Sequence, residues 1–228
     1  MRQCIQALGG EAYLNLQDME QEGRTYSFYN GQPRSVGAPY WRFWKWPDKE
    51  RIELTKKRDV VYVYNADKGY EITFRGTAAE QEESMTEYVR QRHFSLPKVL
   101  REWLPASGTA LFYDGPAVVE RKPTDTVSIM NASNEQVTLY LDVNTHLPIQ
   151  KTFFWRDKDR FRVQDDEVYD NYKPVQSVMT PYSLIRKRDG QMLSQRFIDA
   201  VRYNTGLADS LFEATATWDP YKRSGPRR

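Results

Sequence analysis

The sequence is poor in the residues from which reactive or cross-linked sites are built. Its 228 residues include one cysteine and two histidines. One cysteine excludes a disulfide framework and a cysteine-rich metal cluster within this chain. Cys4 shares a predicted helical face with Ile5 and Leu8, so we expect a buried thiol. His93 and His146 have no ligand-spaced partners in the sequence, which favours satisfied or surface histidines over metal ligands.

Catalytic signatures are also missing. The chain has neither a glycine-rich phosphate loop nor a G-x-S-x-G elbow. Two acidic runs, residues 80–83 and 165–167, are interpreted as a solvated helix start and a solvated hairpin rather than cation ligands. We therefore expect a protein that is not an enzyme and that holds no metal and no cofactor.

Charge and hydropathy exclude two further classes. The 33 Lys and Arg and the 31 Asp and Glu are spread along the chain and leave a net charge of +2. A nucleic-acid surface needs clustered cations, so no nucleic-acid partner is expected. No apolar run approaches the ~20 residues of a membrane-spanning helix. We expect one domain over residues 1–217 and a solvated basic tail over 218–228.

Aromatic side chains, by contrast, are abundant, with 15 Tyr, 10 Phe and 6 Trp. They concentrate in one strand-like segment, Y-W-R-F-W-K-W-P. Alternation places Tyr40, Trp44 and Trp46 on one face, and Trp41 and Phe43 on the other. Rings on both faces indicate a sheet wrapped around something apolar, although ordinary cross-strand packing is the simpler alternative for any single ring. The sequence leaves open which face is the inner one.

Turn residues divide the chain into short elements. A helix over residues 2–8 ends at two glycines, and a helical turn follows over 11–16. Residues 78–104 are the one substantial helical region. The predicted strands, separated by turn chemistry, are 21–29, 40–46, 51–54, 60–64, 70–74, 127–130, 136–141, 149–155, 167–171, 177–180, 182–186 and 192–204. Such hairpin-linked strands favour an antiparallel sheet that is large enough to curl.

The helical region has two apolar faces. The first face follows the acidic residues 80–83, and the second follows Ser95-Leu96-Pro97, which is typical of a helix start. They either pack permanently on the sheet, which the sequence favours, or form a lid that leaves when a ligand arrives. The lid candidates are Met85, Tyr88, Val89, Val99, Leu100, Trp103 and Leu104.

Several short segments carry a family resemblance through their order and spacing. They are A-L-G-G (7–10), W-P-D-K-E-R-I-E (46–53), Y-N-A-D-K-G-Y-E-I (64–72), L-D-V-N-T-H-L-P-I (141–149) and Y-N-T-G-L-A-D-S-L-F (203–212). With these segments the chain resembles the LolA/LolB-like superfamily of bacterial outer-membrane lipoprotein carriers and sorting proteins. One departure is Trp46, which stands where the lipoprotein chaperone of that superfamily has a basic residue that latches its lid.

The resemblance implies an unclosed antiparallel β-barrel of about eleven strands, with helices as a lid over the concave face. It also implies a hydrophobic cavity for acyl chains and a periplasmic location. The chain begins abruptly inside a predicted helix, so we expect that a signal peptide has been removed.

These observations predict a periplasmic carrier or binding protein for the acyl chains of a lipoprotein or lipid, with an envelope membrane protein as the partner expected for delivery. The alternative is an envelope protein-interaction or sensor module on the same fold, without lipid cargo. The candidate cavity residues, apolar side chains on the predicted strands, are Tyr40, Trp41, Phe43, Trp44, Trp46, Ile52, Leu54, Tyr62, Tyr64, Leu139, Leu141, Phe153 and Trp155.

Overall fold

One large antiparallel sheet and a few short helices make up the computed structural model, which describes residues 1–34 and 36–220. The predicted fold class, mainly β with a sheet that does not close, is confirmed. Residues 221–228 of the expected basic tail lie outside the described residues.

The sheet has 14 strands, more than the eleven expected. Two of the strands, β2 and β7, are very short. The strands are β1 (Asp18–Tyr29), β2 (Gln32–Pro33), β3 (Ala38–Lys45), β4 (Lys49–Leu54), β5 (Val60–Asn65), β6 (Lys68–Thr73), β7 (Gly76–Ala79), β8 (Ala110–Val119), β9 (Lys122–Met130), β10 (Gln136–Asp142), β11 (Pro148–Arg156), β12 (Arg162–Val175), β13 (Val178–Arg188) and β14 (Gln191–Tyr203).

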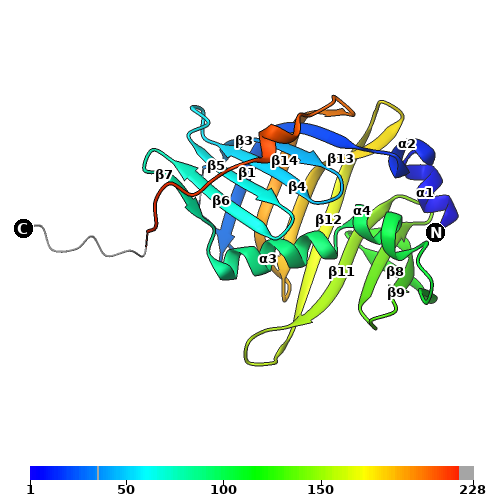
Figure 1. Ribbon diagram of the computed structural model, residues 1–228. Helices are drawn as coiled ribbons and strands as arrows, with labels where there is room; N and C mark the ends of the chain where they lie inside the picture. Colours follow the sequence, from blue (N-terminus) through cyan, green and yellow to red (C-terminus); the bar gives the residue numbers. More distant parts are fainter. Residues whose placement is uncertain (35, 221–228) are drawn as a thin grey trace, which may run out of the picture.

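Neighbouring strands in the sheet are mostly neighbours in sequence. The order is β7-β6-β5-β4-β3-β1-β14-β13-β12-β11-β10-β9-β8, and β2 pairs with β1. The pairing of β1 with β14 joins the first and last strands of the chain in the middle of the sheet. The two ends of the order, β7 and β8, are therefore edges of an open, curved sheet (Figure 1).

The helical elements are α1 (Arg2–Leu8), α2 (Glu11–Leu14), α3 (Glu82–His93), α4 (Leu96–Lys98), the π-helical turn η1 (Val99–Trp103) and the 3₁₀ turn η2 (Asp209–Phe212). The predicted boundary at residue 78 is wrong, because Gly76–Ala79 pairs with β6 as β7. The predicted break inside β13 is also wrong. Pro181 lies opposite Tyr172 of β12, outside the stretch of β13 that pairs with β14, and a proline is tolerated at such an edge position.

The core lies between the concave face of the sheet and the helices α1, α4 and η1. Val99, Leu100 and Trp103 of η1 are buried in it. Phe94 stacks on Phe153 of β11, with ring centroids 4.3 Å apart. Cys4 of α1 is completely buried in the same cluster, which confirms the predicted buried thiol.

Helix α3 differs from the other helices because it has no buried residue. It crosses over the strands (Figure 1) and is held mainly through side-chain tips. Tyr88 stacks on Tyr64 of β5 with ring centroids 3.7 Å apart, and Arg92 donates to the backbone oxygen of Ala66 at 2.7 Å. At the other arm of the curved sheet, Glu87 of α3 forms ion pairs with Arg186 and Arg188 of β13. The helix thus bridges the two arms of the curved sheet.

Candidate functional site

A cavity of about 520 Å³ lies between the concave face of the sheet and the helices. Its wall comes from the middle of the sheet and from α1, α3 and α4. That volume falls within the roughly 300–1,000 Å³ of ordinary ligand pockets. The cavity therefore has room for a ligand that side chains do not fill.

One part of the wall is apolar and aromatic. Burial raises the pKa of the Tyr13 and Tyr203 hydroxyls further above the ordinary value near 10, as expected in an apolar environment. The Tyr203 hydroxyl lies 2.9 Å from that of Thr180, so its polar end is satisfied within the protein. The apolar side chains of this wall are Leu8, Leu16, Met19, Trp44, Ile52, Leu96, Val178, Met179 and Leu184.

A second part of the wall is charged. Lys151 is 1% exposed, and its Nζ lies 2.8 Å from Oε2 of Glu167. Burial by itself raises the pKa of Glu167, but the Lys151 charge and hydrogen bonds from Lys151 and Tyr169 outweigh it and lower that pKa to about 2. Arg42 is likewise paired with Glu50. Fixed ion pairs of this kind orient a polar group more than they attract a hydrocarbon chain.

The acidic run over residues 165–167 is not the solvated hairpin that we predicted: Glu167 lies on this charged side, and Asp166 points to the opposite face, where it accepts from Thr152 at 2.6 Å. Asp165 and Asp166 are buried, and Oδ1 of Asp165 accepts from Arg188 at 2.7 Å. The other run agrees with its prediction in part: Glu82 and Glu83 form the exposed acidic first turn of α3, whereas Glu80 precedes the helix and is half-buried.

The aromatic strand has a defined inner face. Trp44 lines the cavity, and Tyr40 donates from its buried hydroxyl to Oε1 of Gln21, another lining residue, at 3.0 Å. Trp41 lies on the opposite face, where its Nε1 donates to Glu22 at 2.9 Å, and alternation places Phe43 beside it. Of the remaining strand candidates, two more line the cavity, Ile52 and Tyr64.

Other predicted residues lie elsewhere. Trp46 is covered by Arg101, whose guanidinium carbon is 3.6 Å from the ring centroid. Tyr62 donates to Glu71 at 3.1 Å and, like Leu54, does not line the cavity. The core positions that strand alternation did not separate from the cavity wall are Leu139, Leu141 and Phe153. These three side chains are buried because residues of α4 and η1 pack over the β10 and β11 side of the sheet.

The lid candidates divide in the same way. Tyr88 lines the inner cavity, whereas Met85 and Val89 point to the outer side of α3. Leu104 packs against the core that contains η1. The inner face of α3 is polar, so its apolar stripe does not mark the cavity side.

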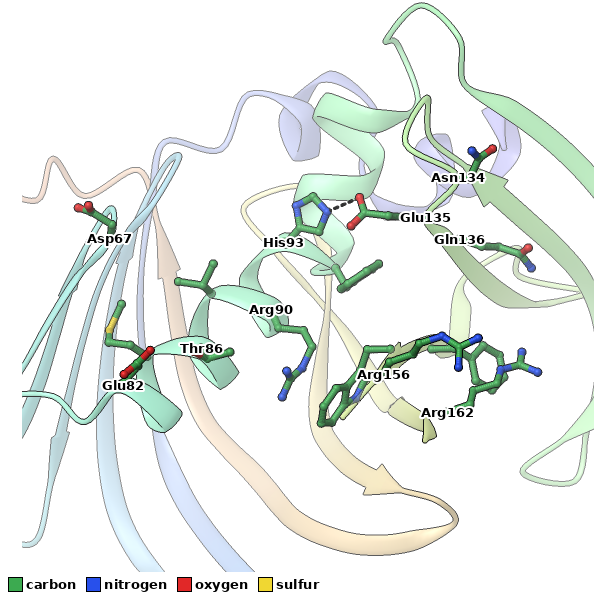
Figure 2. Close-up of a pocket in the computed structure, with 15 residues that line it drawn as sticks. Asp67, Glu82, Thr86, Arg90, His93, Asn134, Glu135, Gln136, Arg156 and Arg162 are labelled. Atoms are coloured by element: carbon green, nitrogen blue, oxygen red, sulfur yellow. Dashed lines mark hydrogen bonds and ion pairs between the residues drawn. The ribbon is translucent and has the colours of Figure 1, made fainter. Parts of the chain in front are cut away.

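The outer side of α3 borders a second, more open pocket of about 790 Å³. Figure 2 shows the side chains of Arg90 and His93 facing this pocket from α3, with Arg156 and Arg162 opposite. Trp155, a predicted cavity residue, lines this outer pocket, and the Arg90 guanidinium carbon lies 3.4 Å from its ring centroid. His93 is paired with Glu135 at 2.7 Å.

Apolar periodicity does not predict the charged cavity residues. Their signal in the sequence is a charged residue two positions away from an inward-facing aromatic residue, and therefore on the same face of the strand. Arg42 lies between Tyr40 and Trp44 in this pattern, and Lys151 lies between Ile149 and Phe153.

No family model and no curated protein sequence matches this chain. Solved structures are similar in fold. A DUF1329 family protein from Desulfovibrio piger has a TM-score of 0.64 at 12% identity, covering 92% of this chain and 94% of that chain. A LolA superfamily protein from Nitrosomonas europaea has a TM-score of 0.57 at 10% identity, covering 92% and 98%. A domain assigned to outer membrane lipoprotein sorting, from Vibrio parahaemolyticus, has a TM-score of 0.54 at 11% identity, covering 86% and 89%. The fold is therefore LolA-like, as the sequence resemblance predicted. None of the helices in the described residues has the length and apolar character that crossing a membrane requires.

Proposed function

We propose that this protein is a non-enzymatic carrier in the bacterial periplasm that binds acyl chains of a lipoprotein or lipid in the inner cavity. The observation that carries the proposal is the 520 Å³ of space beneath the helices, bordered by Leu16, Met19 and Trp44. Transfer of one CH₂ group from water to such a surface contributes about 0.8 kcal/mol. An acyl chain of ordinary length can therefore bind through burial alone.

The neighbouring folds support this proposal at a coarse level. Two of them carry names that refer to the LolA superfamily or to lipoprotein sorting. Delivery to an envelope membrane protein, as well as release of the cargo, belongs to the same proposal. The bridging position of α3 supports a route of entry, because this helix covers the cavity without contributing a fully buried residue.

The proposal is tested by organic extraction of the purified protein followed by mass spectrometry, and by titration with a fluorescent fatty acyl probe. We expect co-purified lipid near one molecule per chain, and probe binding that weakens at least fivefold in Trp44→Ala. Trp41→Ala is the matched control, since it removes an indole from the opposite face of the same strand. Absence of both lipid and probe binding in the folded wild type would refute the carrier.

A second candidate function, an envelope interaction module, is favoured by the sheet edge at β8. This strand is unpaired on one side and exposes Phe112, Tyr113 and Val118, the last to 76%. An exposed edge strand can accept a strand from a partner. A photo-crosslinking residue at Phe112 would then capture one specific envelope protein, whereas the same residue at Phe74, exposed at 90% near the other edge, would not.

A further inference from the structure

The inner cavity carries a surplus of positive charge. Three carboxylates and six cationic side chains line it, which is a formal excess of three positive charges. The carboxylates are Glu50, Glu87 and Glu167, and the cations are Arg42, Arg92, Arg101, Lys151, Arg186 and Arg196. Binding of a hydrocarbon chain alone does not require this excess of charge, and a buried charge is costly without a partner.

Most of these charges are engaged within the protein. Each carboxylate already has a cationic partner. Arg92 and Arg101 donate to backbone oxygens, at 2.7 Å to Ala66 and at 2.8 Å to Leu16. Arg92 and Arg101 therefore link α3 and η1 to the rest of the protein, and their hydrogen bonds are already used there.

Arg196 of β14 is the exception. Among residues 1–34 and 36–220, no carboxylate lies within 4.0 Å of its guanidinium, and the nearest ring contact, to Tyr40, is 5.9 Å from the guanidinium carbon to the ring centroid. Burial and the charges of Arg42 and Arg186 lower the pKa of Arg196, and Glu50 and Tyr40 offset this only in part. Both effects reflect an unfavourable environment for a cation, yet a guanidinium stays protonated in proteins. An anion at this point would relieve that cost.

The apolar wall begins along the same strand. Tyr203, at the other end of β14, pairs with Met19 of β1, and both line the cavity. Arg196 pairs with Thr25 and Tyr203 with Met19, so six residue steps of about 3.3 Å along β1 separate the two positions by about 20 Å. Arg196 and the apolar pair of Met19 and Tyr203 therefore lie at separate points along the cavity wall.

We propose that the cavity accepts an amphiphile with an anionic oxyacid head, carboxylate or phosphate, whose head binds Arg196 and whose chain extends toward Met19 and Tyr203. A guanidinium presents paired donors that match either oxyacid. This inference rests on the proposed function and adds the charge of the ligand and the residue that reads it. Arg196 is a binding residue in this proposal, not a catalytic one.

The test uses the full chain and three probes with the same C12 chain: dodecanoate, dodecyl phosphate and dodecanol. The anions are titrated at pH 8 below their critical micelle concentrations and the alcohol below its solubility limit, with calorimetry as the readout. We expect at least one of the two anions to bind the wild type ten or more times tighter than the alcohol. The preferred anion distinguishes a carboxylate head from a phosphate head.

The variant Arg196→Gln should lose this preference and bind the anions as weakly as the alcohol, while its affinity for the alcohol stays within twofold of the wild type. Arg196→Lys should retain part of the preference. The control is Arg202→Gln, which removes an exposed arginine from the same strand, 73% exposed at its side chain. Circular dichroism and thermal unfolding establish that each variant is folded.

Equal affinity of the wild type for anion and alcohol, or an unchanged preference in folded Arg196→Gln, would overturn the inference and leave the carrier proposal intact. Failure of all three probes to bind would overturn both. The two proposals thus fail in distinguishable ways.

Discussion

Lys151 and Glu167 form an ion pair across β11 and β12, with 2.8 Å between Nζ and Oε2, in a part of the wall where the lysine is almost completely buried. The Tyr169 hydroxyl donates to the same carboxylate oxygen at 2.6 Å. A buried cation without its anion is costly, whereas removal of both charges is often neutral. The pair therefore determines both stability and the polarity of this wall.

The first prediction concerns the removal of one or both charges. Glu167→Gln leaves Lys151 charged and buried, and we expect the free energy of unfolding to fall by about 3–5 kcal/mol. The double variant Lys151→Met/Glu167→Gln keeps an acceptor for Tyr169 and should lose less than the single variant. Urea unfolding followed by tryptophan fluorescence measures both. Equal losses in the two variants would contradict the pairing.

The pH dependence of unfolding provides a second prediction. The pKa of Glu167 is about 2 in the folded protein, against a reference of 4.5, so the folded state favours the ionised carboxylate. Its stabilisation is present in full above pH 4.5 and is lost as the pH falls toward 2. The shift corresponds to about 3 kcal/mol. We expect the wild type to lose that much more than Lys151→Met/Glu167→Gln between pH 4.5 and 2, in urea unfolding at each pH. Parallel pH profiles would refute the assignment.

A third prediction concerns local opening of α3. The stacked pair of Tyr64 and Tyr88 contributes about 0.5–1.5 kcal/mol beyond its buried area. In Tyr88→Ala we expect the amides of α3 to exchange with deuterium at least tenfold faster, while those of η1 keep their wild-type rates. Val89→Ala is the control, because Val89 lies on the outer side of the same helix. Equal acceleration in η1 would show that α3 does not open independently.

Local sequence signals predicted much of this fold. Hairpins whose turns carry glycine or asparagine in left-handed conformations, such as Asn30 and Gly31, have a clear sequence signal, whereas the hairpin of β8 and β9, which turns at Glu120 and Arg121, has none and is missing from the predicted strands. The pairing of β1 with β14 was not found, since it joins residues about 180 positions apart and has no local signal. The end of the sheet at β7 was lost in the same way, because Ala78 and Ala79 favour a helix in isolation and become a strand only beside β6.

The site was harder to predict than the fold. Alternation separates the two faces of a strand, but it does not tell a packed inner residue from one that borders empty space. Phe153 and Ile52 follow the same inward pattern, yet Phe153 is stacked under Phe94 whereas Ile52 borders the cavity. That difference depends on where the helices lie, which is a tertiary property. The role of Arg196 is harder still to predict from the sequence, because it depends on which carboxylates already pair with other cations in the folded protein.

The last prediction concerns the contact between Arg101 of η1 and Trp46 at the end of β3. The guanidinium carbon lies 3.6 Å from the ring centroid, and Arg101 also donates to the backbone oxygen of Leu16 at 2.8 Å. A cation over an indole contributes about 0.5–2 kcal/mol. Single substitutions mix this contribution with the loss of the Leu16 hydrogen bond, so a double-mutant cycle is needed. We expect Arg101→Ala and Trp46→Leu to show a coupling of about 0.5–2 kcal/mol in urea unfolding. The cycle is repeated with Lys98→Ala, whose ammonium lies farther from the ring, at 5.2 Å, and it should give a smaller coupling. A coupling near zero for Arg101 would mean that its contact with Trp46 does not help to hold η1 over the sheet.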